Sequence, residues 1–117
     1  MSNNAKKLHE FGELASGNIY LRPNLLNAER PVIYGHTHNF DHTTFVQQGK
    51  VRVIARRNGE QIADQVFTAP DFFLVKADVE HEIINLVEES LVYCIYAHRD
   101  PQGEIVQEYT GWEKAHL

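Results

Sequence analysis

The sequence predicts an all-β domain, built as an antiparallel sandwich or a small barrel. Three observations support this prediction. Short runs rich in Val, Ile, Phe, Thr and Tyr recur about every ten residues along the chain. Turn-forming residues separate these runs, and the apolar spacing of a helix is nearly absent. Short strands at regular intervals with turns between them are typical of sandwiches and barrels.

A helical spacing occurs only near the N-terminus. The apolar side chains that would share one face of a short helix there are Leu8, Phe11 and Leu14 or Ala15. The next prediction is a strand over 18–22, followed over 23–30 by a loop with one helical turn. Pro31 then opens a strand that runs to His38, because the first position of a strand tolerates a missing N–H.

The remainder of the chain is predicted to consist of strands joined by turns. Asn58-Gly59 is the clearest hairpin signal, because this pair favours the positive φ angles of a two-residue turn. Gly49 and Pro70-Asp71 mark two further turns. The strands predicted after residue 38 are 42–48, 50–57, 61–68, 72–77, 81–86, 91–98 and 105–109. Alternation along the second of these places three side chains inside: Val51, Val53 and Ala55.

Length and composition limit what this domain can be. With 117 residues, 43% of them hydrophobic and 23% charged, the chain suits one globular domain over residues 1–117. Its apolar runs are too short to span a membrane, and no signal-peptide pattern opens it. Eleven basic against 16 acidic residues, without a basic block, argue against nucleic-acid binding. The single cysteine, Cys94, fits a reducing compartment, so we expect a cytoplasmic protein.

Histidine is the part of the composition that points to chemistry. Of the seven histidines, four fall between residues 36 and 81. His36 and His38 lie two residues apart in a predicted strand and therefore share a face. His42 opens the next strand, and His81 comes from a strand much later in the chain. Because neutral imidazoles bind Zn, Fe, Ni and Cu, these four side chains predict a metal site that the fold assembles.

The segment HTHNFDHTTFVQQG resembles the first sequence motif of the cupin family. His36, His38 and Gly49 stand where that motif has its two histidines and its closing glycine. His42 stands in the place of the usual glutamate, and Arg30 stands where the motif usually begins with glycine. The resemblance therefore implies a metal centre that has histidine in place of the carboxylate.

The segment PDFFLVKADVEHEIINL is similar to the second cupin motif. His81 takes the place of its histidine, and Asn85 follows as its asparagine. Three positions depart from the glycine, proline and glycine usual there: Pro70, Lys76 and Asp78. The resemblance covers a core of about residues 30–98. It implies a double-stranded β-helix, a conical jelly-roll barrel with a metal ion inside.

Strand alternation adds candidates for the cavity wall. Tyr34 shares a face with the histidines of its own strand, and Tyr96 shares one with Cys94 and His98. The candidate catalytic residues are therefore Tyr34, Tyr96 and His98. Strand 91–98 is apolar on both faces, so the sequence leaves open which face points inward. Its outer face needs a cover, and a homodimer formed through the sheet would supply one.

The expected ligands favour particular chemistry. Four neutral histidines leave the 2+ charge of a divalent ion uncompensated, and such a centre favours an anionic, chelating small molecule. We expect a metal-dependent dioxygenase with Fe(II) that acts on a diketone, a phenolic compound or an organic acid. Ni, Zn, Mn and Cu are the other candidate ions. Two alternatives are a non-redox isomerase or lyase, and a domain that binds a small molecule without turnover.

Overall fold

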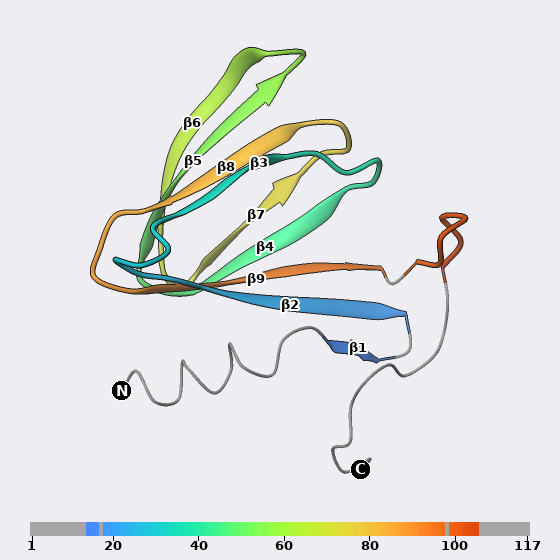
Figure 1. The fold of residues 1–117 in the computed structure, drawn as a ribbon, viewed down its shortest axis with the longest axis horizontal. Coiled ribbons are helices and arrows are strands. Elements are labelled where there is room, and N and C mark those ends of the chain that lie inside the picture. The colour runs from blue at the N-terminus through green and yellow to red at the C-terminus, as the bar shows by residue number, and fades with distance from the viewer. Residues whose placement is uncertain (1–13, 17, 98, 106–117) are drawn as a thin grey trace.

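The nine strands of the computed structural model form two antiparallel sheets that pack face to face (Figure 1). The structure describes residues 14–16, 18–97 and 99–105, with the backbone alone for residues 14–16 and for His36. The predicted all-β class is confirmed, since none of these described residues lies in a helix. This part of the chain accordingly holds no helix able to cross a membrane.

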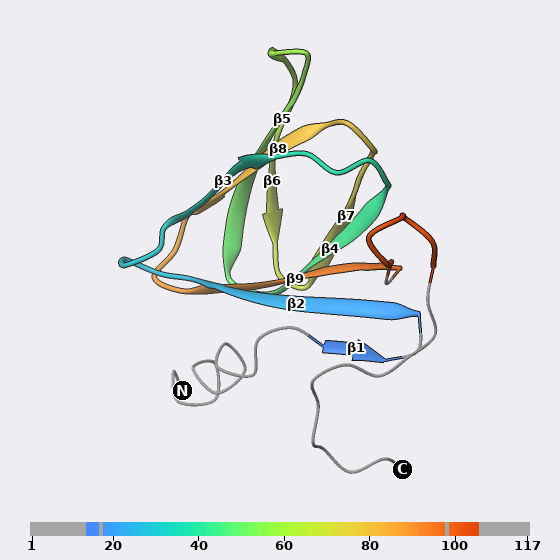
Figure 2. The same ribbon diagram turned by 45° about the vertical axis from the view of Figure 1, so that its right-hand side comes forward.

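The two sheets differ in size and draw on distant parts of the chain. The larger sheet has the order β1 (Leu14–Ser16), β2 (Ile19–Leu26), β9 (Ser90–Ala97), β4 (His42–Gln48) and β7 (Asp71–Val75). The smaller sheet has the order β3 (Val32–His36), β8 (Glu80–Asn85), β5 (Lys50–Arg57) and β6 (Glu60–Thr68). The pairing of early strands with late ones is typical of a jelly roll. Figure 2 shows the turn between β5 and β6 projecting from the body of the barrel.

The hydrophobic core lies between the sheets and takes side chains from both. Six buried apolar residues form it: Leu26, Val46, Val51, Val53, Ile83 and Val92. Val51 and Val53 are buried in β5 while Arg52 between them is exposed, which confirms the inward face that alternation predicts. A smaller cluster lies on the other face of β2 and β9: Leu25, Leu91 and Tyr93.

Two turns follow directly from the residues that make them. Asn58 and Gly59 join β5 to β6 with φ angles of 52° and 80°, which confirms the predicted two-residue turn. Gly49 separates β4 from β5 with φ of 89°. A Cβ atom there would collide with the Ser90 hydroxyl oxygen and the Glu89 carbonyl oxygen. Glycine is therefore required at residue 49 both by its φ angle and by the close approach of β9.

Strand β2 differs most from its prediction. It continues through Pro23 to Leu26, so the loop with a helical turn predicted over 23–30 is wrong for its first half. Among the described residues, β1 pairs with β2 only as far as Leu21, so on that side no described strand faces Pro23, where a missing N–H is tolerated. Burial of Leu25 and Leu26 favours the extended conformation beyond that proline.

The two ends of the chain test the predictions only in part. Leu14 and Ala15 lie in β1 and not in a helix, while the remainder of the predicted helix falls outside the described residues. Ile105 forms an isolated bridge with Arg99, and the rest of the strand predicted over 105–109 also falls outside them.

Candidate metal centre

Three histidines from three segments meet inside the barrel. His38 follows β3, His42 begins β4, and His81 lies in β8. Each offers one ring nitrogen, and these nitrogens all lie within 4.8 Å of one another. Ring centroids are 5.0 Å apart for His38 and His42, 5.1 Å for His42 and His81, and 5.9 Å for His38 and His81. We call these three residues the histidine group.

Burial distinguishes the members of the group. The side chains of His42 and His81 are buried, with 3% and 1% of their surfaces exposed, and His38 is half-buried. The group is therefore closed off on the side of His42 and His81 and accessible at His38. Neutral imidazoles are common metal ligands, so three of them gathered in this way could hold an ion.

Hydrogen bonds hold the loop that carries His38 against the loop that precedes His81. The backbone N–H of Asp78 donates to the His38 carbonyl oxygen at 2.7 Å. The N–H of Ala77 donates to the Asp41 carboxylate, also at 2.7 Å. Asp78 has φ of 65°, a left-handed conformation that suits the glycine usual at this place in the second motif. The substitution thus keeps the backbone conformation that brings His81 to its place.

The geometry fits a transition metal. Bonds of about 2.0–2.1 Å from a zinc ion to imidazole nitrogen limit two such nitrogens to about 4.2 Å apart. The observed limit of 4.8 Å is slightly wider, so small ring rotations would bring all three nitrogens onto one ion. His81 Nδ1 lies 3.4 Å from the Val79 carbonyl oxygen. When Nδ1 carries the proton it donates to that oxygen, which leaves the Nε2 lone pair for the metal.

The fourth predicted ligand and one catalytic candidate are not tested. Only the backbone of His36 is described, and its Cα pairs with that of His81 across β3 and β8. Ligation by His36 therefore stays a prediction. His98 lies outside the described residues.

The expectation that Tyr34 lines the cavity is wrong. Its side chain is 76% exposed. The pairing of β3 with β8 is irregular between Ile33 and His36, which interrupts the alternation on which that expectation depends.

Tyr96 lies beside the histidine group, which settles the inward face of β9. Its ring centroid is 6.0 Å from those of His38 and His42. Phe40 and Tyr20 lie against it, with centroids at 4.9 Å and 4.7 Å. Phe40 also stacks on His38 at 5.0 Å. Aromatic rings thus pack against His38, and Tyr96 brings a phenol side chain to the neighbourhood of the histidine group.

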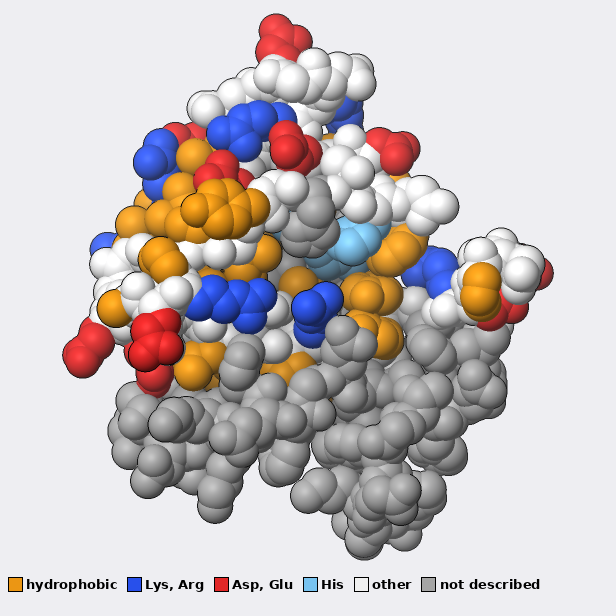
Figure 3. All heavy atoms as spheres, viewed as in Figure 1, with side chains coloured by type: hydrophobic (Ala, Val, Ile, Leu, Met, Phe, Trp, Pro, Cys, Tyr) orange, Lys and Arg blue, Asp and Glu red, His pale blue; other side chains and the backbone are white. Residues whose placement is uncertain are grey.

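A cavity of about 220 Å³ begins at the exposed side of the histidine group. We call it the basic cavity, and its lining residues are Arg22, Asn24, Arg30, Ile33, His38, Ile83, Cys94 and Tyr96. In Figure 3, side chains of the Lys and Arg class lie near histidine on the face that is drawn. The two arginines of the cavity are not among the residues that the sequence pattern predicts for the site. Extending the strand at 18–22 to Leu26 would have placed Arg22 and Asn24 on the same inward face as Tyr20.

Cys94 also lines the basic cavity. It lies two residues before Tyr96 in β9, on the same face of the strand. Burial raises the pKa of its thiol, an effect that exceeds the opposing influences of Thr44 and Arg22. The thiol is therefore neutral near pH 7 and is a poor nucleophile.

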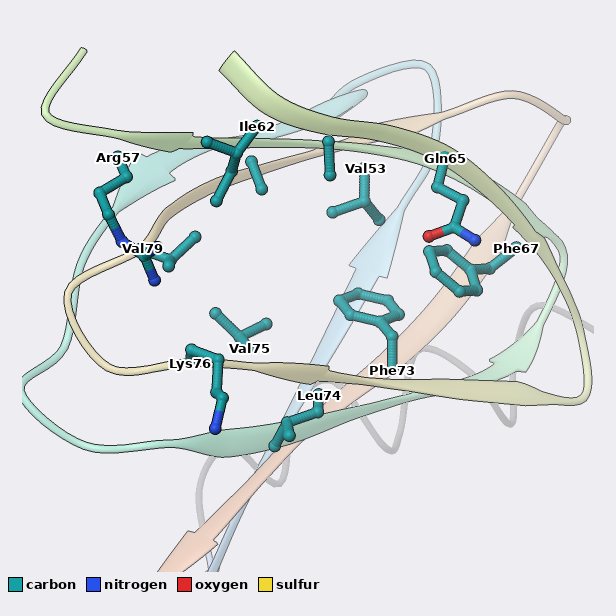
Figure 4. Close-up of a pocket in the computed structure, with 12 residues that line it drawn as sticks. Val53, Arg57, Ile62, Gln65, Phe67, Phe73, Leu74, Val75, Lys76 and Val79 are labelled. Atoms are coloured by element: carbon teal, nitrogen blue, oxygen red, sulfur yellow. The ribbon is translucent and has the colours of Figure 1, made fainter. Parts of the chain in front are cut away.

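A second cavity of about 200 Å³ lies between β5, β6 and β7. We call it the apolar pocket (Figure 4), and its wall includes Val53, Ala55, Phe67, Phe73, Val75 and Val79. Ala55 pairs with His81 across β5 and β8, and Val75 pairs with His42 across β4 and β7. The apolar pocket thus lies next to the histidine group, but none of the three histidines is part of its wall.

Fold and site together define a small jelly-roll domain with a histidine group that could hold a metal ion. No family model matches the sequence, and no curated protein matches it significantly. Solved structures do match the fold. One is an RmlC-like cupin family protein with a double-stranded β-helix fold from Methanocaldococcus jannaschii, at 12% identity and TM-score 0.60, covering 74% of this chain and 76% of that one.

Two enzymes share the fold over a smaller part of their length. Hydroquinone 1,2-dioxygenase from Sphingomonas sp. TTNP3, solved with 4-hydroxybenzoate, matches at 13% identity and TM-score 0.62, over 70% of this chain. Oxalate decarboxylase from Lactobacillus farciminis, in a formate complex, matches at 19% identity and TM-score 0.60, also over 70%. This chain spans about a quarter of either enzyme, with 25% and 24% covered. The matches confirm the cupin-type fold that the two motifs imply.

Proposed function

We propose that this protein is a metal-dependent enzyme that acts on a small, chelating organic anion, with oxygenase chemistry on Fe(II) as the first candidate. One observation carries the proposal. His38 belongs to the histidine group and also borders the basic cavity, so an ion held by the group would meet a ligand in a cavity lined by arginines. The known dioxygenase with this fold supports oxygenase chemistry by similarity of fold alone.

The proposed ligands are His38, His42 and His81, with His36 as a fourth. When bound, the metal would act as a Lewis acid that polarises the substrate and would supply redox chemistry if it is iron. Because the ligands are neutral, the chain adds no negative charge to this centre, which favours binding of an anion. Tyr96 borders the same cavity as His38, and we assign to its phenol the role of holding or delivering a proton at the substrate.

The second candidate is non-redox chemistry by an isomerase or lyase at the same centre. The neutral ligand set favours it equally, because a strong Lewis acid stabilises an enolate without any oxidant. Oxalate decarboxylase shows that the fold also supports reactions that cleave a carbon–carbon bond of a small carboxylate. Binding without turnover is the third possibility, and the same experiment distinguishes all three.

The test is anaerobic purification, removal of metal with a chelator, and reconstitution with Fe(II), Zn(II), Mn(II), Ni(II) or Cu(II). Reconstitution is needed because an all-nitrogen site intrinsically prefers Cu, Ni and Zn over Fe, so the ion found after purification is not by itself the working one. Oxygen consumption with diketones, phenols and organic acids is then measured. Uptake with iron alone supports the oxygenase, and turnover without oxygen supports the isomerase or lyase. Failure to bind any of the five ions would overturn the proposal.

We also propose that the protein forms a homodimer through the outer face of the larger sheet. Phe72 and Leu74 of edge strand β7 are 65% and 60% exposed on that face. Their cross-strand partners Phe45 and Thr43 carry no charge, so two copies of an acidic chain can approach there without repulsion. Light scattering should give the mass of a dimer for the native chain and of a monomer for Leu74→Glu. A native monomer would contradict this.

A further inference from the structure

The basic cavity carries positive charge, although the chain as a whole is acidic. The protein carries a formal net charge of −5. Yet Arg22 and Arg30 are the charged side chains of the cavity wall, and no acidic residue is among the described residues that line it. A local excess of two positive charges in an acidic protein marks a place where an anion is favoured over its surroundings.

The strand register places Arg22 close, along β2, to the tyrosines that lie beside the histidine group. Tyr20 pairs with Tyr96, and Arg22 pairs with Cys94, so Arg22 stands two residues along β2 from the ring that lies beside His38. Two residues of an antiparallel strand span about 7 Å. Arg22 and His38 both line the basic cavity. The arginine is thus near enough to contact one end of a small molecule held there.

Arg30 lines the same cavity from the loop between β2 and β3. Its Nη2 donates to the Asn24 side-chain oxygen at 3.4 Å, and Asn24 is 5% exposed. Asn24 faces inward two residues beyond Arg22. A buried amide thus links Arg30 to the wall that carries Arg22. The planar guanidinium group matches the two oxygens of a carboxylate, which makes this wall suited to a carboxylate.

We infer that the basic cavity takes a small organic dianion, with a chelating 2-oxo or 2-hydroxy acid group toward the metal and a second carboxylate toward Arg22 and Arg30. This inference rests on the proposed metal centre and adds the substrate class to it. The volume of about 220 Å³ lies below the roughly 300–1,000 Å³ of common ligand pockets, so the dianion has a short carbon chain.

The test compares two probes that differ only at the far end. 2-Oxoglutarate carries a carboxylate there, and 2-oxopentanoate carries a methyl group on a chain of the same length. Binding is measured by calorimetry on the Zn(II)-loaded protein, because zinc is redox-inert and prevents oxidative turnover. Zinc stoichiometry is measured on each sample. The native protein should bind 2-oxoglutarate at least tenfold more tightly than 2-oxopentanoate.

The variants Arg22→Gln and Arg30→Gln isolate the carboxylate contact. Each should weaken 2-oxoglutarate binding about tenfold to a hundredfold, as expected for the loss of hydrogen bonds between charged groups. Binding of 2-oxopentanoate should change by less than about threefold, since each variant keeps the metal centre. Arg52→Gln is the matched control: it removes the same charge from the outer face of β5, where Arg52 pairs with Asp64, and should change neither affinity.

The outcomes separate this inference from the proposed function. Zinc bound at one ion per chain with equal affinity for both probes would overturn the dianion and leave the metal centre intact. If both arginine variants still bind 2-oxoglutarate more tightly than 2-oxopentanoate by the native factor, the assignment of the second carboxylate to Arg22 and Arg30 is overturned. Absence of zinc from the native protein would overturn the metal centre itself, and this inference with it.

Discussion

The basic cavity and the apolar pocket are nearly equal in volume, at about 220 and 200 Å³, but differ in chemistry. His38 borders the first, together with two arginines and a buried amide. The second is walled mainly by apolar side chains, with Arg57, Gln65 and Lys76 as its polar members. Under the proposed function, a ligand of the metal enters from the basic cavity, and the apolar pocket borders the other side of the histidine group.

The position of the apolar pocket follows from the strand register. Val75 and Ala55, on the wall of the apolar pocket, are the cross-strand neighbours of His42 and His81. Apolar side chains at those positions keep water from the buried imidazoles on that side. Low polarity there strengthens the interaction of a bound ion with an anion approaching from the basic cavity. From this contrast we expect different roles for the two cavities, ligand binding for the basic cavity and stability for the apolar pocket.

Removal of a histidine should have the largest effect, because it removes a ligand from the metal. His42→Ala and His81→Ala should each reduce bound metal from about one ion per chain to near zero after dialysis against Zn(II), measured by mass spectrometry of the metal. Val79→Ala is the control on the apolar side, and it should keep the metal while losing about 1–2 kcal/mol of stability. Full metal content in both histidine variants would show that the site is wrongly assigned.

Removal of the metal should have the next largest effect. An ion present at a hundred times its dissociation constant stabilises the native state by about 2.7 kcal/mol if it binds only the folded chain. Chelation of the loaded protein should lower the unfolding midpoint by several degrees, as measured by calorimetry. The same treatment should leave His42→Ala unchanged. An equal shift in that variant would place the stabilising ion elsewhere.

Phe73→Ala tests the structural role of the apolar pocket. The Phe73 ring stacks on Phe67 with centroids 4.6 Å apart, and both pack against the core. Because Phe73 is only partly buried, its truncation should cost about 2–3 kcal/mol in the free energy of unfolding, at the lower end for such changes. Metal content should not change. A loss of metal without loss of stability would contradict the separate roles of the two cavities.

The smallest expected effect is on the alkylation rate of the Cys94 thiol. This rate indicates whether the basic cavity is occupied. Since its pKa is raised, alkylation by iodoacetamide at pH 8 should be several-fold slower in the folded than in the unfolded protein, and should accelerate as the pH rises. The raised pKa stabilises the fold below the pKa of the unfolded thiol, and this contribution is lost as the pH rises through the folded value. Zn(II) with 2-oxoglutarate should slow alkylation further. Equal alkylation rates in the presence and absence of Zn(II) and 2-oxoglutarate would argue against a ligand beside Cys94.

The sequence was most informative where alternation and turn residues agree. β4 and β5 have the predicted bounds because their apolar residues alternate and Gly49 and Asn58-Gly59 end them. The motifs also predicted the convergence of His38, His42 and His81, since their register depends on the same strands.

Two parts of the site could not be derived in this way. Pro23 and the polar residues around it lack the sequence pattern of a strand. The inward direction of Arg22 and Asn24 follows instead from the pairing of β2 with β9, which lies about 70 residues away in the sequence. Tyr34 follows alternation in the sequence, but the irregular pairing of β3 turns it outward. Long-range pairing and local irregularity of strands are tertiary properties that a local pattern does not contain.

The most direct test of the central claim is a crystal structure of the Zn(II)-loaded protein with 2-oxoglutarate, in which anomalous scattering locates the ion. We predict one ion bonded to His38, His42 and His81, with the ligand extending from it into the basic cavity toward Arg22 and Arg30. An ion bound elsewhere, or a ligand that enters the apolar pocket, would contradict the account.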